Sequence, residues 1–319
     1  MRTAAGLILR RLALLIPMML AVIAFIFIVL ALSPNSAAVS VLGNNASQAQ
    51  IDTFNHEHGL DRPLPVRYVS FLGDLLHGDM GNTFALNQPV MGIIKQALPI
   101  TLQVTVFGVI GAIVVALVLG VIGALYRDRW PDQVTRVLSM AGIAIPSFWL
   151  GILMIQRFSA IGGGPFPSGR YVPFAQSHYD WAMSLVLPAI AVAVPVGCSL
   201  SRVVRTSMVE ELDRDYVRTA LGSGLPPVVV IGRNVLRNAL VTPLTVLGLQ
   251  IGYLIGGTVV IEAIFSLPGM GTQIMTAITQ NDVGLARGLV ITIALGFVIV
   301  NLLVDILYLI LNPRLRGAH

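Results

Sequence analysis

Charged residues are scarce in this sequence. Asp, Glu, Lys and Arg make up 11 % of its 319 residues, whereas a soluble domain usually contains about 25 %. Apolar residues account for 55 %, and the mean hydropathy is +0.83. Too few polar side chains are present to cover a water-soluble globule, and intrinsic disorder is excluded for the same reason. The composition predicts a membrane protein.

Cysteine and lysine are each present once. Cys198 cannot form an internal disulfide, a Cys-x-x-Cys metal site or a redox pair. Because it lies in an apolar run, we expect it to be a small buried hydrophobe. Lys95 stands between Ile94 and Gln96, so the chain lacks the Gly-Lys-Ser/Thr ending of a P-loop. If ATP drives this protein, another subunit must bind the nucleotide.

Catalytic and metal-binding signatures are also missing. The sequence contains no Gly-x-Ser-x-Gly elbow and no His-Glu-x-x-His pair, and its five histidines all lie outside the apolar runs. We therefore predict no enzymatic activity, no metal site and no cofactor bound by this chain. Only Asp305 lies well inside an apolar run. One acid supports ion-coupled transport weakly, and an interhelical hydrogen bond explains it equally well.

Six runs have the length of a membrane span, which needs about 20 apolar residues. They cover residues 12–32, 98–126, 137–156, 181–201, 239–261 and 288–312. The first run is too long for the apolar region of a signal peptide and has no clear cleavage site after it. We predict an all-α membrane protein with six transmembrane helices.

The positions of the basic residues predict the orientation. Segments 1–11, 127–136, 202–238 and 313–319 hold 14 of the 20 Lys and Arg residues. Basic residues gather on the cytoplasmic side of membrane proteins, so both termini are predicted to be cytoplasmic. The same pattern explains the net charge of +5 by cytoplasmic loops near anionic lipid, and no basic cluster suggests nucleic-acid binding.

Two connecting segments are long enough to have roles of their own. We divide the chain into residues 1–32, the cytoplasmic N-terminus and first span; residues 33–97, an external segment; and residues 98–319, a five-helix core. The external segment is too small for a large core of its own, so it is expected to pack on the membrane domain or on a partner. Residues 202–238 form a long cytoplasmic loop.

This loop contains the signals of a short helix. Asp213 or Asp215 can cap its N-terminus, because a carboxylate accepts free backbone N–H groups and suits the helix dipole. Gly222 or Gly224 can adopt the left-handed conformation that ends a helix, and the prolines at 226 and 227 prevent its continuation. The spacing predicts a helix of about two turns outside the bilayer.

One face of that helix suggests a role. Tyr216, Thr219 and Ala220 lie on the same side by their i, i+3, i+4 spacing. Small residues let another surface approach closely, which favours a helix seated in a groove of a partner. An amphipathic linker lying on the membrane surface is an equally good interpretation of the spacing.

The sequence here resembles a family. The stretch DYVRTALGSG (215–224), followed by LRNALVTP (236–243), is similar to the EAA loop of bacterial ABC importer permeases. Further similarity, to the permeases of dipeptide and oligopeptide importers, is carried by LRRLALLIP (9–17), HGLDRPLP (58–65), GDMGNT (78–83), IPSFWLG (145–151), FSLPGMG (265–271) and NLLVDILY (301–308). The match runs nearly end to end, and it is to the first of the two permease types.

The resemblance implies a type I importer permease fold and a location in the cytoplasmic (inner) membrane. It also implies a second permease chain, two ATPase subunits that bind ATP and Mg, and an external substrate-binding protein. The imported solutes would be di- or oligopeptides, although relatives also carry nickel complexes and glutathione. The residues implied in ATPase coupling are Asp215, Tyr216, Arg218, Thr219, Ala220 and Gly224.

Within the spans, glycines are candidates for close helix packing, and polar residues are candidates for lining the path of the solute. Gly248, Gly252 and Gly256 repeat at i+4 spacing, which predicts a tight crossing within this chain or against the second permease; ordinary glycine enrichment is the alternative. Polar residues could line the path or form interhelical hydrogen bonds: Gln103, Ser147, Gln250, Glu262, Asn301 and Asp305. Pro146, Pro188, Pro195 and Pro243 could allow bending or produce static kinks.

Three functions are thus weighed. The first is a permease subunit of an ATP-driven, binding-protein-dependent peptide importer. The alternative is a self-contained secondary transporter or channel, and a third possibility, an intramembrane enzyme, has no catalytic constellation. ATPases that copurify with the chain would distinguish the first from the second.

Overall fold

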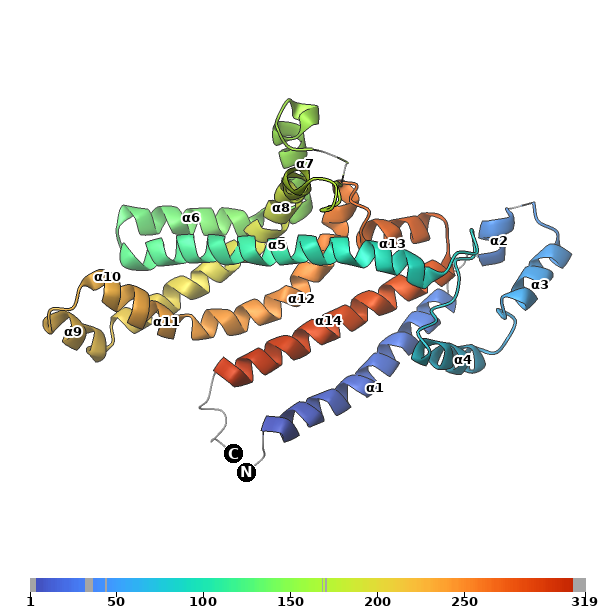
Figure 1. The fold of residues 1–319 in the computed structure, drawn as a ribbon, viewed down its shortest axis with the longest axis horizontal. Coiled ribbons are helices and arrows are strands. Elements are labelled where there is room, and N and C mark those ends of the chain that lie inside the picture. Colours follow the sequence, from blue (N-terminus) through green and yellow to red (C-terminus); the bar gives the residue numbers. More distant parts are fainter. Residues whose placement is uncertain (1–3, 32–36, 44, 168, 170, 312–319) are drawn as a thin grey trace. The chain divides into compact units, whose positions relative to one another are not determined.

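The chain folds into helices joined by turns. The computed structural model describes residues 4–31, 37–43, 45–167, 169 and 171–311. Within these residues no strand forms, and β-structure is limited to two isolated bridges. The six longest elements among them are α1 (Ala4–Ala31), α5 (Val90–Leu125), α6 (Trp130–Ala144), α8 (His178–Leu212), α12 (Val241–Ile264) and α14 (Val283–Leu311) (Figure 1). The prediction of an all-α protein is confirmed.

Four of these helices, α5, α8, α12 and α14, are each long and apolar enough to cross a membrane. The pair α6 and α7 (Ser147–Phe158) meets the same test when taken together. The first predicted span coincides with α1, in which the described apolar stretch is Leu15–Val29. A helix is therefore present at each of the six predicted positions.

The third predicted span is broken at Pro146, one of the four prolines for which the sequence predicted a bend or a kink. Helix α6 ends at Ala144, α7 begins at Ser147, and the two axes differ by 99°. Ile145 has the extended conformation, with ψ 119°, which the residue before a proline prefers. Pro146 also lacks the N–H needed to continue the helix. By contrast, Pro188 and Pro195 lie inside the unbroken α8.

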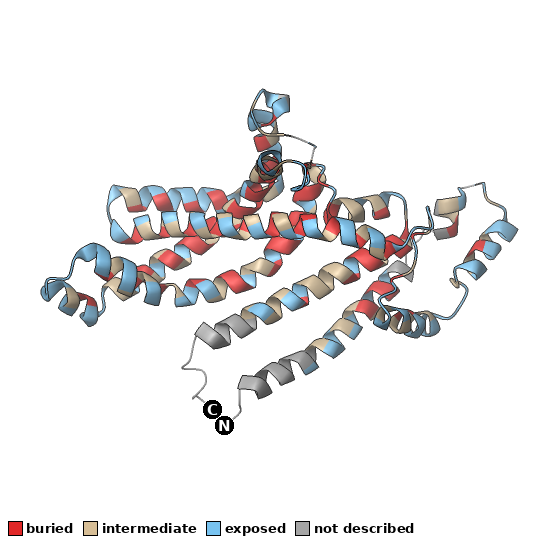
Figure 2. Ribbon diagram, viewed as in Figure 1, coloured by how far each residue is buried: buried red, intermediate tan, exposed pale blue. Residues whose placement is uncertain are grey.

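The contacts of the chain divide it into two compact units. The first, which we call the core unit, comprises residues 1–5, 102–267 and 300–319. Its central element is α8, which has 67 % of its apolar stretch buried, against 28 % in α5 and 39 % in α12 (Figure 2). A helix that is apolar all round belongs inside a bundle. The other helices expose large apolar residues, such as Val106 and Val114 of α5 and Leu249 of α12.

Small residues allow close approach to α8. A Cβ added at Gly197 of α8 would lie 2.7 Å from Cβ of Val115, and one added at Gly120 of α5 would lie 2.6 Å from Cβ of Val204. On the other side of α8, Gly142 of α6 lies directly against Cys198. Cys198 is buried, as predicted. These crossings follow the small-residue packing of membrane helices.

The second unit, which we call the outer unit, comprises residues 6–101 and 268–299. It contains α1, the helices α2 (Ala37–Leu42), α3 (Gln48–Glu57) and α4 (Leu64–Leu76), helix α13 (Met270–Thr279) and the first half of α14. Asp282 is buried and accepts hydrogen bonds from the amides of Leu285, at 2.9 Å, and Ala85, at 3.2 Å. The external segment thus packs on membrane helices of its own chain.

Candidate coupling site

The cytoplasmic helix predicted from the sequence is present as α9 (Asp215–Gly222). Its N-cap residue is Arg214, and no side chain caps it, so the prediction of an aspartate cap was wrong. Asp213 is instead the C-cap of α8, while Asp215 lies in the first turn of α9, where its charge suits the dipole. Gly224 has φ +80°, the left-handed conformation expected for the residue that ends the helix.

Helix α9 is anchored by an apolar residue that the sequence analysis missed. Val217 is 3 % exposed and belongs to a cluster with Met208 of α8 and Ala239 of α11 (Leu236–Ala239). Ala220, one turn further on, packs against the same cluster. The i, i+3 spacing of these two apolar residues in a polar helix was the available signal. Burial of this face holds α9 against the end of α8.

The predicted face of α9 also takes part in a hydrogen-bond network. The Tyr216 hydroxyl donates to Oε1 of Glu211 at 2.9 Å, and the Asn238 amide donates to both groups at 3.4 Å. Partial burial raises the pKa of the Tyr216 phenol above its ordinary value. The neutral phenol is therefore the form that joins α9 to α8 and α11.

The outward side of this region is apolar and exposed. Five residues form what we call the coupling surface, with exposures of 37 % to 81 %: Tyr216, Leu221, Leu225, Val228 and Val229. Arg218 and Thr219 are exposed beside them. The prolines at 226 and 227 do more than end α9, because α10 (Pro227–Val229) begins there and leads through a π-helical segment, Val230–Val235, into α11. An exposed apolar patch with a polar rim is typical of a protein interaction site.

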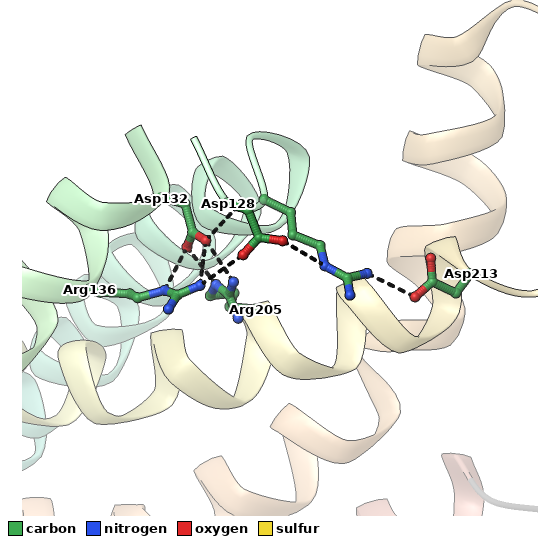
Figure 3. A network of polar contacts seen from close by, with 6 residues as sticks. Asp128, Asp132, Arg136, Arg205 and Asp213 are labelled. Carbon is green, nitrogen blue, oxygen red and sulfur yellow. Dashed lines mark hydrogen bonds and ion pairs between the residues drawn. The ribbon is translucent and has the colours of Figure 1, made fainter. Parts of the chain in front are cut away.

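Beside α9, a charged network centres on Asp132 (Figure 3). Its side chain is 0 % exposed, and both carboxylate oxygens accept from Arg205 of α8, at 2.6 and 2.7 Å. Arg136, one turn further along α6, donates to the same oxygens at 3.2 and 2.7 Å. The buried charge is therefore paired and hydrogen-bonded, as a buried carboxylate must be. This network locks α6 onto α8.

The network continues to the residues just before α9. Arg136 pairs with Asp128 at 3.6 Å, and Arg127 pairs with Asp128 at 3.5 Å and with Asp213 at 2.9 Å (Figure 3). Asp213 lies two residues before α9 begins. The sequence analysis missed this network; Arg136 at i+4 from Asp132 was a local signal, but Arg205 is distant in sequence.

The predicted packing glycines differ from one another. A Cβ at Gly248 would collide with Val304 of α14, so these helices approach closely there. Gly252 is buried. A Cβ at Gly256 would have no atom of this chain within 4 Å, which leaves that end of the row open to another surface.

The predicted polar span residues are not brought together into one site. Oε1 of Gln103 accepts from Tyr171 at 2.9 Å and from Trp181 at 2.8 Å, so Gln103 forms interhelical hydrogen bonds. Glu262 is fully buried within the described chain. Gln250 and Asn301 are half-buried, and the side chain of Asp305 lies outside the described part of the chain.

Ser147 is the polar candidate that lines a cavity. The cavity, about 190 Å³, lies at the break between α6 and α7, where α8 and α12 close it with residues that include Pro195, Tyr253 and Gly257. No cluster of three metal-ligating side chains occurs among the described residues. The described geometry is thus a bundle of long apolar helices with the short polar helix α9, which is anchored by Val217 and Ala220 and exposed at its remaining residues.

Two family models of membrane permeases match this chain. The family model for the "Binding-protein-dependent transport system inner membrane component" matches residues 116–317, and the model for the N-terminal part of such components matches residues 5–105. The chain belongs to this family of permeases and is a multi-pass protein of the inner membrane.

Relatives of known name are similar over almost their whole length. A "Putative peptide transport system permease protein" of Brucella abortus (strain 2308) is 41 % identical over 311 residues, which cover 98 % of this chain and 99 % of the relative. A glutathione transport system permease protein of Pectobacterium atrosepticum is 33 % identical over 96 % and 97 % of the two chains.

A solved structure shows the same fold. A chain of the MetNI methionine ABC transporter, in an inward facing conformation, aligns with a TM-score of 0.56 over 70 % of this chain and 97 % of that chain. The sequence identity is 14 %, so this likeness concerns the fold alone. It confirms the type I importer permease architecture.

Proposed function

We propose that this chain is one of two permease subunits of an ATP-driven importer of di- or oligopeptides. The observation that carries the proposal is the coupling surface, a set of exposed apolar residues on α9, on the turn after it and on α10, next to the buried anchor Val217. Such a surface is suited to receive a partner and to transmit its movement. The names of the relatives, which refer to peptide and glutathione transport, support a peptide-like solute.

The partners follow from the family and from what the sequence lacks. We infer a second permease chain, two ATPase subunits and an external substrate-binding protein. Without a P-loop, this chain has no route of that kind to ATP hydrolysis, so ATP and Mg would be bound by the ATPase subunits. The chain itself would bind no cofactor and would not be an enzyme. A secondary transporter would need none of these partners.

Mechanically, the proposal treats the end of α8 as the transmitting element. A partner that seats on the coupling surface moves α9, and α9 is joined to α8 through Val217 and Tyr216. The Asp132–Arg205 pair passes the displacement to α6. Because α8 is the buried centre of the core unit, a shift there changes the packing of its neighbours between two discrete arrangements.

The solute path is expected near the cavity at the α6–α7 break. Its lining by Ser147, Tyr253 and Gly257 combines a hydroxyl, an aromatic ring and exposed backbone. Such groups can contact peptide backbones without selecting one side chain. Selectivity would then be determined mainly by the delivery protein.

The coupling surface is tested by charge substitutions that spare the anchor. Val228 is 81 % exposed, so Val228→Asp should leave the fold intact while it disrupts an apolar interface. We expect the variant, purified from cells that express the complex, to lose its copurifying ATPases and its peptide-dependent ATP hydrolysis. Leu86→Asp, at a residue 69 % exposed in the outer unit, is the matched control.

A second pair of variants tests the helix itself. Ala220→Trp overfills the anchored side of α9, and Gly224→Trp places a side chain at φ +80°. Both should weaken ATPase docking. If Val228→Asp, Ala220→Trp and Gly224→Trp all retain ATPases and transport, the assignment of the coupling surface fails.

A further inference from the structure

A cavity of about 160 Å³ in the outer unit carries an excess of positive charge. It lies between the turn after α3, one side of α4 and the start of α14, and its lining includes three arginines, Arg62, Arg67 and Arg287. Asp74 is the acidic residue of the lining. Among the described residues, no carboxylate lies within the 4.0 Å ion-pair distance of any of the three guanidinium groups. The described lining thus holds three cations and one acid, Asp74, and keeps a net positive charge.

Arg287 shows most clearly that a counter-charge is required. It lies in α14, one of the membrane spans, and its Nε atom is buried without a hydrogen-bond acceptor in the described chain. Its guanidinium carbon lies 4.3 Å from the ring centroid of Phe71 and 5.3 Å from that of Phe27. The rings offer cation–π attraction, but they cannot accept the guanidinium hydrogens as an oxyanion would.

Arg67 is in a similar position. One of its terminal nitrogens donates to the carbonyl of Leu60, at 3.4 Å, and burial lowers the pKa of its guanidinium. A partly desolvated cation that has only one long hydrogen bond to a neutral group is poorly compensated. Two arginines from different elements thus share a need for the same kind of ligand.

The position of α4 along α1 indicates whether the ligand is a lipid or a solute. The hydroxyl of Tyr68 donates to the carbonyl of Leu20, at 2.9 Å. Leu20 precedes the last residue of α1, Ala31, by eleven residues, which is about 16 Å along a helix axis. Helix α4 packs along α1 from Leu20 to its outer end. Phe27, over which Arg287 lies, precedes Ala31 by only four residues, about 6 Å, which places the charged cavity at the level of the lipid headgroups.

The face of α4 next to the cavity is apolar and exposed. Val66, Val69 and Leu76 have exposures of 50 %, 65 % and 88 %. On the helix, the cavity-lining Ser70 is one turn from Val66, so the charged cavity borders this apolar face directly. An apolar helix face beside basic groups is the pattern of a segment that lies in the membrane interface.

We propose that this cavity binds the phosphate group of a phospholipid from the outer leaflet, with the acyl chains along the apolar face of α4. The arginine forks match the geometry of a phosphate, and the apolar face matches the lipid tails. A free peptide carboxylate would use the charged cavity but not that face. The surplus of cationic over acidic lining groups favours a lipid of net negative charge, such as phosphatidylglycerol, over a zwitterionic one.

The test is native mass spectrometry of the full chain, released from nanodiscs of equal phosphatidylglycerol and phosphatidylcholine. The wild type should retain phosphatidylglycerol preferentially. Arg62→Ala and Arg67→Ala should each reduce that preference about fivefold. Lys95→Ala, which removes an exposed cation from the same unit, should leave it unchanged. Thermal unfolding in detergent identifies any variant that fails to fold. Arg67→Lys, which keeps the charge, should retain more of the preference than Arg67→Ala.

Competitors distinguish the sources of the anion. Inorganic phosphate and the dipeptide dialanine, each at millimolar concentration, should not displace the bound lipid. Val69→Ser, on the apolar face, should weaken retention of the lipid. Equal retention of both lipids, an equal loss in Lys95→Ala, or displacement by dialanine would each overturn the proposal. Because this readout needs no partner subunit, its failure is separable from a failure of the proposed transport function.

Discussion

At the scale of single residues, Asp132 shows how a buried charge can join distant parts of a chain. Its carboxylate is inaccessible to solvent, yet Arg205 and Arg136 satisfy both oxygens. Arg205 is itself only 22 % exposed. A pair of this kind has a high cost when one partner is removed, because the other charge stays buried and uncompensated.

Substitution of Asp132 should therefore destabilise the core unit. We expect Asp132→Asn to lower the free energy of unfolding by about 3 kcal/mol, since the guanidinium of Arg205 keeps its burial and loses its counter-charge. Asp128→Asn is the matched control, because its side chain is 76 % exposed and exposed pairs contribute at most about 1 kcal/mol. Thermal unfolding of the purified chain in detergent measures both. Equal effects of the two substitutions would contradict this account.

At the scale of elements, packing around α8 depends on where side chains are absent. Gly197 and Gly120 let α5 and α8 approach closely, and Gly142 does the same for α6. In the row predicted from sequence, Gly248 lies in close contact with Val304 of α14, whereas Gly256 has open space beside it. Glycine spacing alone therefore indicates a candidate crossing but does not identify its partner.

The different surroundings of these glycines predict different effects of a Gly→Val substitution on stability. Gly197→Val would place atoms within 2.8 Å of the Ala112 carbonyl oxygen and should destabilise the chain by about 3 kcal/mol through overpacking. Gly256→Val has open space in this chain and should leave its thermal unfolding unchanged. Loss of the second permease from purified Gly256→Val would support an intersubunit crossing there. Unchanged stability of Gly197→Val would refute the close packing of α5 on α8.

At the scale of the whole molecule, the distribution of basic residues gives the chain its orientation. The α5–α6 turn and the coupling surface belong to segments rich in arginine, whereas the outer unit holds most of the external segment. The orientation matters because it assigns the two sites to opposite compartments. In the predicted orientation the coupling surface would face the cytoplasm, where ATP is available, and the arginine-lined cavity of the outer unit would lie on the external side.

Cysteine labelling tests this orientation directly. Native Cys198 is buried and should not react with a membrane-impermeant maleimide. In spheroplasts, Leu86→Cys should be labelled without further treatment, and Arg129→Cys should be labelled only after permeabilisation. Both positions are exposed. Labelling of Arg129→Cys in intact spheroplasts would contradict a cytoplasmic location of the α5–α6 turn.

Local properties of the sequence were sufficient to predict the positions of the membrane spans and of α9. The length of each apolar run predicts a span, because a helix must satisfy its own backbone hydrogen bonds in lipid. The Asp-to-Gly stretch at 215–224 predicted α9, and only the identity of its cap was wrong. The family resemblance added the fold type and the partners. Each of these inferences needs residues that are near one another in sequence.

The remaining features required the tertiary structure, because they join residues that are far apart along the chain. Asp132 meets Arg205, Gly248 meets Val304, and Arg67 shares a cavity with Arg287. No sequence period relates such positions; their proximity depends on how the helices pack. Composition and run length determined that this chain crosses a membrane and exposes a coupling helix. Long-range packing decided which charges form pairs, as Asp132 and Arg205 do, and which lie together in one cavity, as Arg67 and Arg287 do.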